Sequence, residues 1–355
     1  MSGAFRSMMA AVLAVICISV PAAALELSAE SAVLMDAESG RILYAVEADR
    51  PAPMASITKL MTALVAVDTC PLETPMTVTA AHAAAGGSSM YLRAGEVLTL
   101  EQLLYGLLLA SGNDAALTIA DGCCGDTAAF VAAMNERAVA MGLTQTRFAN
   151  PNGLDAEGHY STVTDIARLM AECLERDVLL RMLSTTSVTL PGRTLTNHNK
   201  LLWRYDGCIA GKTGYTDNAG RTLVTAAERD GQVLIAVTFR DRNDWVDHAA
   251  LYDYGFDAYP RRTLCTAGAV LARCPVGETE GTLAAAETLH YPLTEGEEPV
   301  LTLDLPEGVQ APVSAGTAAG RAVYTLDGTV IGETVLVWTA DIPAERSSFW
   351  SRWRS

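Results

Sequence analysis

The hydrophobic and polar positions change their period along the chain, and these changes divide it into regions. Residues 31–50 (SAVLMDAESGRILYAVEADR) predict two strands around a turn at Glu38-Ser39-Gly40. Residues 56–68 (SITKLMTALVAVD) instead predict a helix, and its apolar positions cover most of the helical circumference. A helix with that pattern is buried on nearly every side.

The middle third of the chain has a helical period. Residues 98–122 predict two helices separated by a break at Ser111-Gly112-Asn113. Residues 128–142 and 162–177 predict two further amphipathic helices. This part of the chain is therefore expected to form a helical lobe.

From about residue 186 the period becomes that of strands. Residues 222–239 (TLVTAAERDGQVLIAVTF) are two apolar runs around Arg229-Asp230-Gly231, the residues of a hairpin turn. After Phe256 the content of Gly, Thr, Pro and Glu rises, and residues 322–338 alternate like strands. We therefore expect an α+β fold.

The expected domain organisation has four parts. Residues 1–24 are expected to form a signal peptide, 25–258 a large domain, 262–340 a small β-rich domain and 341–355 a tail. The last nine residues, SSFWSRWRS, are either a frayed end or a segment that contacts the membrane interface, where Trp and Arg are favoured.

The first 24 residues have the pattern of an export signal. Arg6 supplies a positive start, residues 8–20 are apolar, and Pro21 to Ala24 offer small residues for cleavage. The alternative is a retained transmembrane anchor, for which the apolar run is somewhat short. We expect export, with a mature chain that starts at about Leu25.

Charge and cysteine content limit the classes of partner. A net charge of -16 argues against nucleic acid or an anionic lipid surface as the main partner, because both need a basic face. Seven cysteines remain after cleavage, and buried free thiols are the simplest interpretation, with Cys265 and Cys274 the first pair to test for a disulfide. No CxxC or HExxH spacing occurs, so neither a metal nor another cofactor is expected.

Lysine is rare in this chain, and its positions point to chemistry. Only three of the 25 cationic residues are lysines: Lys59, Lys200 and Lys212. Lys59 follows Ser56 by three positions in an apolar helix, so the two side chains share one face. Burial lowers the pKa of a lysine toward the range in which the neutral amine accepts a proton, which arginine cannot do. The pair therefore predicts a hydroxyl nucleophile beside its base, although Ser56 as a helix cap and Lys59 reaching solvent remain the structural alternative.

Two further motifs strengthen the chemical interpretation. Ser111 and Asn113, at the break between two helices, can both point into a cleft, although these residues are also common in plain turns. Lys212, Thr213 and Gly214 can form a carboxylate site along a strand edge. A phosphate-binding P-loop is excluded there because position 206, where its first glycine would fall, is Asp.

The three motifs together resemble those of the serine D-alanyl-D-alanine carboxypeptidases, the low-molecular-mass penicillin-binding proteins of bacteria. SITK, SGN and KTG look like the active-site motifs of that family, and residues 148–162 (FANPNGLDAEGHYST) are similar to a stretch typical of it. The resemblance is strong over roughly residues 27–258. It implies the β-lactamase/DD-peptidase fold, an antiparallel sheet with a helical lobe and the cleft between them.

The resemblance also implies a role for each matching residue. Ser56 would be the acylated nucleophile, Lys59 its base and Ser111 a proton relay, while Asn113 would hold the peptide amide. Lys212 and Thr213, beside Gly214, would receive the terminal carboxylate, and the backbone N–H groups of Ser56 and Tyr215 would form the oxyanion hole. The family places an arginine near that carboxylate, and the register leaves Arg240 and Arg242 open, with Arg242 the expected one.

The implied substrates are peptidoglycan stem peptides that end in D-Ala-D-Ala, and β-lactam antibiotics would acylate the same serine. The protein would act outside the cytoplasmic membrane, in the cell wall or periplasm, with peripheral contact to the outer face of the cytoplasmic membrane through its tail. Two alternatives stay open. A class A-like β-lactamase needs a glutamate to activate water, and Glu157 and Glu172 lie in the relevant interval. A non-catalytic peptide-binding protein would keep the cleft without the reaction.

Overall fold

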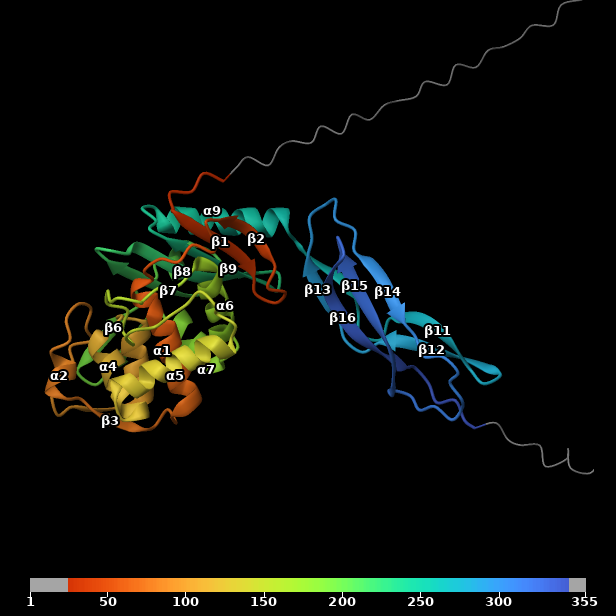
Figure 1. Cartoon of the computed structure of the whole chain (residues 1–355), viewed down its shortest axis with the longest axis horizontal. Coiled ribbons are helices and arrows are strands. Elements are labelled where there is room, and N and C mark those ends of the chain that lie inside the picture. Colours follow the sequence, from red (N-terminus) through yellow and green to blue (C-terminus); the bar gives the residue numbers. More distant parts are fainter. Residues whose placement is uncertain (1–24, 345–355) are drawn as a thin grey trace, which may run out of the picture.

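A five-stranded antiparallel sheet forms the centre of the larger domain in the computed structural model, which describes residues 25–344. The spatial order of the strands is β2-β1-β9-β8-β7, so the N-terminal hairpin lies beside strands from the end of the domain (Figure 1). The strands are β1 (Ser31–Asp36), β2 (Ile42–Val46), β7 (Cys208–Thr216), β8 (Gly220–Arg229) and β9 (Gln232–Phe239).

Both faces of this sheet are covered. On β1, Val33 and Met35 belong to the main core shared with the helical lobe, whereas Leu34 points to the opposite face, against α9 (Asp244–Ala258). Successive side chains of a strand alternate between faces, so a strand buried on both sides needs apolar residues at every position. This explains the continuous apolar run that the sequence shows in β1.

The helical lobe packs on one face of the sheet, with short strand pairs at its periphery. Its elements are η1 (Ala55–Thr58), α1 (Lys59–Thr69), β3 (Pro75–Thr77), α2 (Ala80–Ala83), β4 (Val97–Thr99), α3 (Leu100–Leu108), α4 (Asn113–Cys124), α5 (Thr127–Ala140), α6 (Val163–Leu174), α7 (Asp177–Ser184), β5 (Ser187–Leu190), β6 (Arg193–Thr196) and α8 (Leu201–Arg204). The predicted break between two helices lies between α3 and α4.

The predicted hairpin between β8 and β9 is confirmed. Asp230 and Gly231 both have left-handed backbone angles, with φ of 53° and 75°, and Arg229 pairs with Gln232 across the turn. Two consecutive residues with positive φ are the conformation of a type I′ turn, which suits the twist of antiparallel strands. This hairpin puts β8 beside β7, the strand that carries Lys212.

The C-terminal region is a separate β-rich domain with its own core. Its main sheet has the order β11-β12-β16-β15-β14, and β10 pairs with β13. The core includes Leu283, Leu336 and Trp338. The strands are β10 (Arg261–Cys265), β11 (Val270–Val276), β12 (Thr279–Ala285), β13 (Leu289–Pro292), β14 (Val300–Asp304), β15 (Ala318–Leu326) and β16 (Thr329–Trp338).

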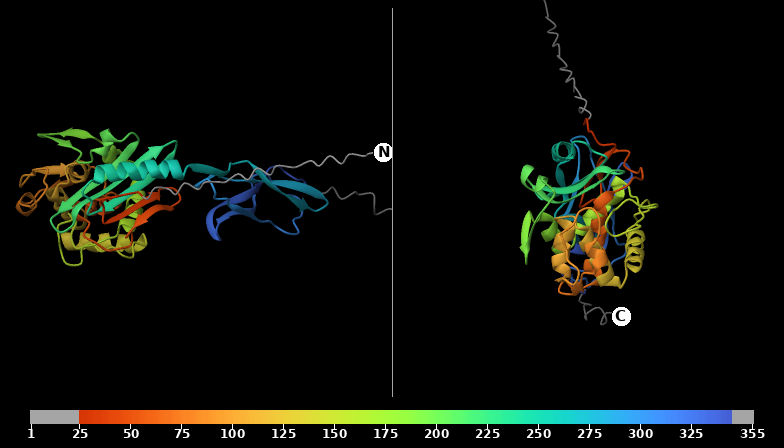
Figure 2. Two further views of the ribbon diagram at one scale, coloured as in Figure 1. Left: turned by 90° about the horizontal axis from the view of Figure 1, so that it is seen from above. Right: turned by 90° about the vertical axis from the view of Figure 1, so that its left-hand side faces the viewer.

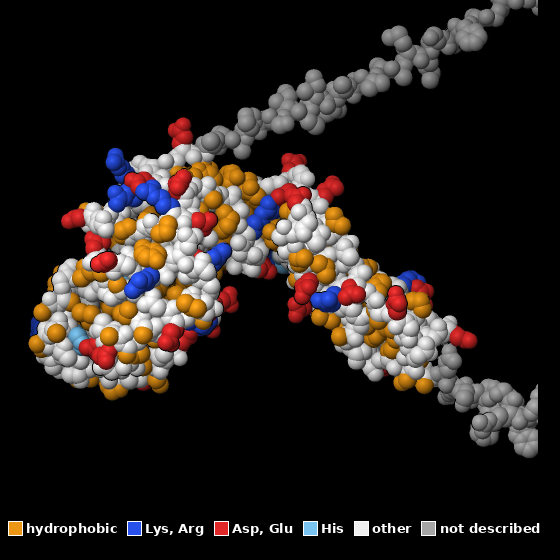
Figure 3. Space-filling view, in the orientation of Figure 1, with side chains coloured by type: hydrophobic (Ala, Val, Ile, Leu, Met, Phe, Trp, Pro, Cys, Tyr) orange, Lys and Arg blue, Asp and Glu red, His pale blue; other side chains and the backbone are white. Residues whose placement is uncertain are grey.

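Arg41, in the turn between β1 and β2, joins the two domains, which lie end to end in Figure 2. Its guanidinium donates to the carbonyl of Pro292 at 2.6 Å and to the carboxylate of Glu297, and it stacks on Tyr259 and Tyr291. Acidic side chains lie on both domains on the face seen in Figure 3.

The expected α+β fold is confirmed, with an antiparallel sheet, a helical lobe and a C-terminal β-rich region. The predicted signal peptide lies outside the described residues, as does the predicted tail from residue 345 onward. Among residues 25–344 no single helix has the length and apolar composition to cross a membrane. Only α4 and α5, bent by 87° at their junction, meet that test, as a pair and by length and composition alone.

Candidate active site

A cleft of about 360 Å³ opens between the sheet and the helical lobe, and it brings the three sequence motifs together. Its walls come from the start of the η1 turn, the loop before α4, the strand β7 and the first residues of α9. The residues that line it are Ser56, Ser88, Ser111, His198, Lys200, Thr213, Gly214, Tyr215, Arg221, Asp244 and Trp245.

Ser56 lies in the 3-10 turn η1, and Lys59 is the first residue of α1. In a 3-10 turn the side chains at positions i and i+3 eclipse, so Lys59 lies directly behind Ser56. The preceding residue, Ala55, has a left-handed φ of 50°, which is uncommon for a residue with a Cβ. The Ala55 carbonyl packs so closely on Gly153 that a Cβ atom at position 153 would lie 2.1 Å from the Ala55 oxygen.

Lys59 is completely buried and reaches three oxygen atoms. Its Nζ lies 2.8 Å from the Ser56 hydroxyl and 2.7 Å from Asn113 Oδ1, and it also donates to the carbonyl of Asn152. A neutral amine has two N–H donors and one lone pair. The amide and carbonyl oxygens only accept hydrogen bonds, so they take both N–H groups, and the lone pair faces the Ser56 hydroxyl.

The environment of Lys59 favours this neutral form. Burial lowers the pKa of Lys59 well below its usual value, the positive charge of Lys212 lowers it further, and Asp114 opposes the shift in part. Lys59 makes no salt bridge, because its nearest oxygens are neutral. The helix-cap and solvent-exposed alternatives for this pair are therefore ruled out by the geometry: Ser56 makes no cap hydrogen bond and Lys59 has no exposed surface.

Ser111 of the SGN motif contacts Lys212 of the KTG motif. It has a left-handed φ of 58°, and its hydroxyl accepts a hydrogen bond from Lys212 Nζ at 3.0 Å. Lys212 is also buried, and burial lowers the pKa of this lysine to about 7. A strained serine held by a lysine across the cleft is unlike a plain turn, and backbone strain of this kind concentrates at functional sites.

The strand β7 approaches Ser56 so closely that position 214 has to be glycine. A Cβ on Gly214 would lie 2.3 Å from Thr222 Oγ1 and 3.1 Å from the backbone nitrogen of Ser56. The neighbouring residues Thr213 and Tyr215 line the same cleft, and the Tyr215 side chain is largely exposed. The edge of β7 therefore runs alongside the predicted nucleophile.

Asn113 lies behind the cleft wall, not in its lining. Its Oδ1 accepts from Lys59 and its Nδ2 donates to the carbonyl of Gly86 at 2.6 Å. The next residue, Asp114, is fully buried and accepts hydrogen bonds from the backbone N–H groups of Met90 and Leu92. The start of α4 thus holds both Lys59 and the loop that forms one side of the cleft.

The arginine that lines the cleft is Arg221, and neither arginine considered from the sequence does so. Arg242 is exposed and lies outside the lining. Arg240 donates to the carbonyl of Asn218 and faces Glu30 at 3.8 Å. Arg221 projects from β8, next to β7, which is a different segment from the one the register suggested.

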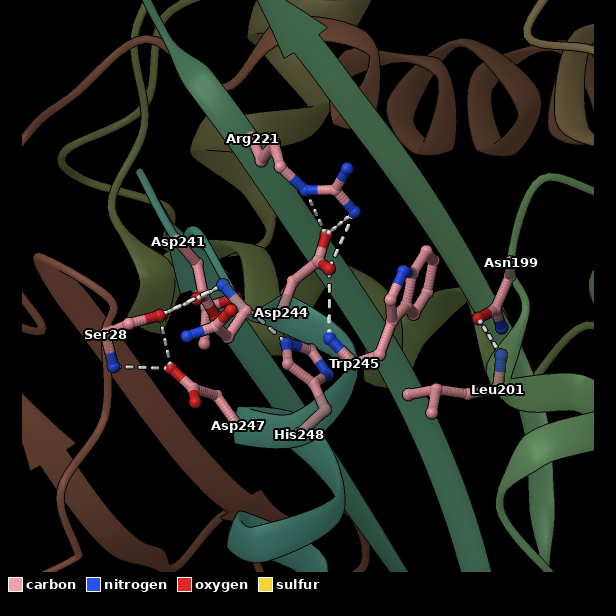
Figure 4. Close-up of polar contacts among 11 residues, drawn as sticks. Ser28, Asn199, Leu201, Arg221, Asp241, Asp244, Trp245, Asp247 and His248 are labelled. Carbon is pink, nitrogen blue, oxygen red and sulfur yellow. Dashed lines mark hydrogen bonds and ion pairs between the residues drawn. The ribbon is translucent and has the colours of Figure 1, made fainter.

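Asp244 and Trp245 hold the Arg221 side chain in the cleft wall (Figure 4). The guanidinium donates through Nε and Nη2 to the Asp244 carboxylate at 3.0 and 2.6 Å, and it stacks on Trp245 at 5.7 Å. Burial raises the pKa of Asp244 and the hydrogen bonds from Arg221 oppose this. Because Nε and Nη2 carry these bonds, Nη1 is the part of the fork that remains for a ligand.

Sequence reasoning also missed Ser88 and His198 in the lining, since neither belongs to a recognisable spacing. Lys200, the third lysine of the chain, lines the cleft as an exposed residue. Glu157 and Glu172 do not line it, and Glu172 pairs with Arg137 at 2.8 Å and with Arg176 at 3.0 Å.

No cysteine is among the residues that line this cleft. Over residues 25–344 there is no group of His, Cys, Asp and Glu arranged to hold a metal ion. Cys265 and Cys274 are both buried free thiols, and each donates to a different carbonyl, those of Glu287 and Pro306.

Comparison with known proteins gives a consistent picture. Residues 18–243 match the peptidase S11 model, described as D-alanyl-D-alanine carboxypeptidase, and residues 259–344 match the C-terminal domain of penicillin-binding protein 5. The chain is 31% identical to the D-alanyl-D-alanine carboxypeptidase DacF of Bacillus subtilis (88% of this chain, 86% of that protein) and 31% identical to DacA of Escherichia coli (90% and 84%). Penicillin-binding protein 5 of Haemophilus influenzae superposes with a TM-score of 0.75 at 28% identity, over 90% of this chain and 98% of that one.

Proposed function

Since this chain belongs to the peptidase S11 family of D-alanyl-D-alanine carboxypeptidases, we propose that it removes the terminal D-Ala of peptidoglycan stem pentapeptides through an acyl-enzyme on Ser56. The observation that carries the proposal is the Lys59 amine, which is buried, held by two neutral oxygens and 2.8 Å from the Ser56 hydroxyl. This arrangement presents a buried base to a hydroxyl that lines the cleft.

The first step forms the acyl-enzyme. Lys59 takes the proton of Ser56 while the oxygen attacks the carbonyl carbon of the penultimate D-Ala. The backbone N–H groups of Ser56 and Tyr215 stabilise the oxyanion, and the close approach of Gly214 to Ser56 N supports this pairing. The proton that Lys59 accepted passes to the departing amine through Ser111, which Lys212 holds in place, so D-Ala leaves and Lys59 is neutral again.

The second step returns the enzyme to its starting state. Water attacks the acyl carbonyl, Lys59 accepts its proton, and Ser56 leaves with the proton restored. Asn113 positions Lys59 throughout, because its amide is bonded on both sides. A β-lactam acylates Ser56 in the same way, but its opened ring stays attached, so no small group departs and hydrolysis is slow.

The terminal carboxylate of the substrate is bound by Lys212, Thr213 and Arg221. Thr213 and Arg221 line the same cleft as Ser56, and Lys212 supplies a positive charge behind them. Arg221 takes the role that the sequence gave to Arg242. The support is its place in the lining and its fixed orientation between Asp244 and Trp245.

The protein is exported and acts in the cell wall or periplasm, where stem peptides are exposed. The hydrophobic start of the sequence supports export, and the aromatic and basic tail supports peripheral contact with the outer face of the cytoplasmic membrane.

The test is the release of D-Ala from diacetyl-Lys-D-Ala-D-Ala by the purified mature chain, followed beside the turnover of benzylpenicillin. We expect steady D-Ala release, slow loss of penicillin, and neither reaction with Ser56→Ala. Rapid penicillin turnover without D-Ala release would instead identify a β-lactamase. Tight peptide binding without either reaction would identify a receptor.

A further inference from the structure

Two aspartates are buried where the N-terminal segment crosses the start of α9. Asp241 and Asp247 are 1% and 5% exposed, and the Ser28 hydroxyl lies between their carboxyl groups (Figure 4). Ser28 Oγ is 2.7 Å from Asp241 Oδ1 and 3.0 Å from Asp247 Oδ2. The second carboxyl oxygen of Asp241, Oδ2, is buried and has no hydrogen-bond partner among the described residues. The three side chains form a polar cluster outside the lining of the catalytic cleft.

The hydrogens around Ser28 are too few for two ionised carboxylates. The Ser28 hydroxyl has one hydrogen, so it donates to only one of the two aspartates. The backbone N–H of Asn243 lies 3.0 Å from both Ser28 Oγ and Asp241 Oδ1. The backbone N–H of Ser28 donates to Asp247 Oδ2 at 2.6 Å. The remaining contact between Ser28 Oγ and a carboxyl oxygen is therefore favourable only if that carboxyl group carries a proton and donates it.

In the part of the chain that the structure describes, no salt bridge neutralises either aspartate. The ionisable side chains on the surrounding elements are Glu30, Tyr44, Arg221, Arg240, Arg242, Asp244 and His248. Of the three arginines, Arg221 is bound by Asp244 and the other two are exposed. Burial lowers the pKa of His248 to about 3, so its ring is neutral. The pair of aspartates is thus left with a proton as its means of losing charge.

We propose that Asp241 and Asp247 share one proton through the Ser28 hydroxyl, and that this cluster positions Arg221 for the substrate carboxylate. Two adjacent carboxyl groups retain a proton because the two negative charges would repel each other. Burial raises the pKa of Asp241 to about 6, the hydrogen bond from Ser28 opposes this shift, and the charge of Asp247 adds to it. The pair holds its proton at mildly acidic pH and loses it as pH rises through about 6.

The cluster fixes the loop that holds Arg221. The backbone N–H of Asp241 donates to the carbonyl of Arg221 at 3.0 Å, and three residues later Asp244 binds the guanidinium. Ser28 joins the two ends of this segment, because it contacts Asp241 before the helix and Asp247 within its first turn. Asp241 and Asp247 are therefore positioning residues. This second part of the inference rests on the proposed function, whereas the shared proton does not.

The direct test follows the carboxyl carbons of isotope-labelled aspartate by NMR in the purified mature chain, from about pH 3 to about pH 8. We expect the Asp241 carbon, assigned by its absence in Asp241→Asn, to titrate near pH 6. The same signal should remain in Asp257→Asn, a change at an exposed aspartate of the same helix. Titration of Asp241 below about pH 5 would overturn the shared proton.

Thermal unfolding gives a second readout. A carboxyl group whose folded-state pKa is raised stabilises the folded chain at low pH, and this contribution is lost as pH rises through the folded-state pKa. Asparagine has no proton to lose, so the melting temperature of Asp241→Asn relative to wild type should rise by roughly 5 °C between about pH 4 and about pH 7. Asp257→Asn should stay parallel to wild type. A constant difference for Asp241→Asn, or a wild-type protein stabilised by calcium chloride at about pH 8, would contradict the proposal.

Acylation rates test the positioning of Arg221. Ser28 lies at the surface, so Ser28→Ala removes the bridging hydroxyl without opening the core. At about pH 6 we expect its acylation by benzylpenicillin to slow roughly 3- to 10-fold, with no loss for a penicillin ester, which lacks the carboxylate charge. Ser28→Thr keeps the hydroxyl and should restore the rate. An equal loss with both compounds, or none, would refute the positioning role. If Arg221→Ala also fails to distinguish the two compounds, the proposed carboxylate site itself is wrong.

Discussion

The two domains differ in the polar and charged side chains that they bury. The larger domain buries Lys59 and Lys212 completely and gives neither of them a carboxylate partner. In the described part of the C-terminal domain, Thr334 is the one buried polar side chain, and the core is otherwise apolar. Burying an amine without a carboxylate partner costs free energy, so the comparison indicates where stability has been given up for chemistry.

Backbone strain follows the same division. Two non-glycine residues at the site have left-handed backbone angles. Ala55 directly precedes Ser56, and Ser111 accepts the hydrogen bond from Lys212. In the C-terminal domain Asp327 is left-handed too, but it lies in the turn between β15 and β16, where such angles are ordinary. Strain inside a cleft therefore carries more functional information than strain in a hairpin.

The largest expected effect comes from Lys59→Arg. Arginine keeps the positive charge but cannot give up its proton, so acylation by benzylpenicillin should slow on the order of 10²- to 10⁴-fold. The matched control is Lys200→Arg, an exposed lysine of the same cleft, which should stay within about twofold of the wild type. Stopped-flow measurement of the acylation rate decides, and an active Lys59→Arg protein would refute the role of the neutral amine.

Arg221→Ala should reduce acylation less, by about 10- to 100-fold, because it removes one charge-assisted hydrogen bond to the substrate carboxylate. Arg242→Ala is the matched control and should have little effect, since Arg242 is exposed outside the cleft. Rates with benzylpenicillin and with an ester of it, which lacks the carboxylate charge, give a sharper comparison. The defect of Arg221→Ala should vanish with the ester.

The pH dependence of acylation sharpens the contrast between the two buried lysines. Lys59 has to be neutral and Lys212 charged, and burial lowers the pKa of Lys212 to about 7. As pH rises through this value Lys212 loses its proton, so the second-order acylation rate should fall above about pH 7. In Lys212→Arg the falling limb should move to higher pH because arginine stays protonated. If the falling limb stays at the same pH in Lys212→Arg, a group other than Lys212 causes the loss of activity.

The smallest effect on activity is expected from the C-terminal domain. Trp338→Ala opens a cavity in its core and should destabilise that domain by roughly 3–5 kcal/mol. The acylation rate of Ser56 should nevertheless stay within about twofold of wild type, because the two cores are separate. The measurement is chemical denaturation followed by circular dichroism, with penicillin labelling at each denaturant concentration. A loss of labelling as the C-terminal domain unfolds would contradict the independence of the two domains.

Local patterns predicted much of this molecule. Apolar periodicity indicated α1, α3, α4 and α6, and the Asp230-Gly231 pair indicated the hairpin between β8 and β9. A lysine in an apolar helix conflicts with the usual preference for apolar residues there, and that conflict singles out Lys59 from its neighbours in the sequence alone.

Contacts between distant segments could not be predicted in the same way. Arg221 reaches the cleft because β8 lies beside β7, and its partner Asp244 comes from the first turn of α9. Neither fact follows from local spacing, so the sequence pointed to Arg240 and Arg242 and not to Arg221. His198 and Ser88 were missed for the same reason, since their place in the lining depends on tertiary packing.

The most direct measurement is mass spectrometry of the mature protein after brief exposure to benzylpenicillin. We expect one intact drug molecule bound covalently, and it should map to the tryptic peptide of residues 42–59, which contains Ser56. The Ser56→Ala protein should carry none. An adduct on another peptide, or hydrolysed drug without any adduct, would contradict the assignment of Ser56 as the acylated nucleophile.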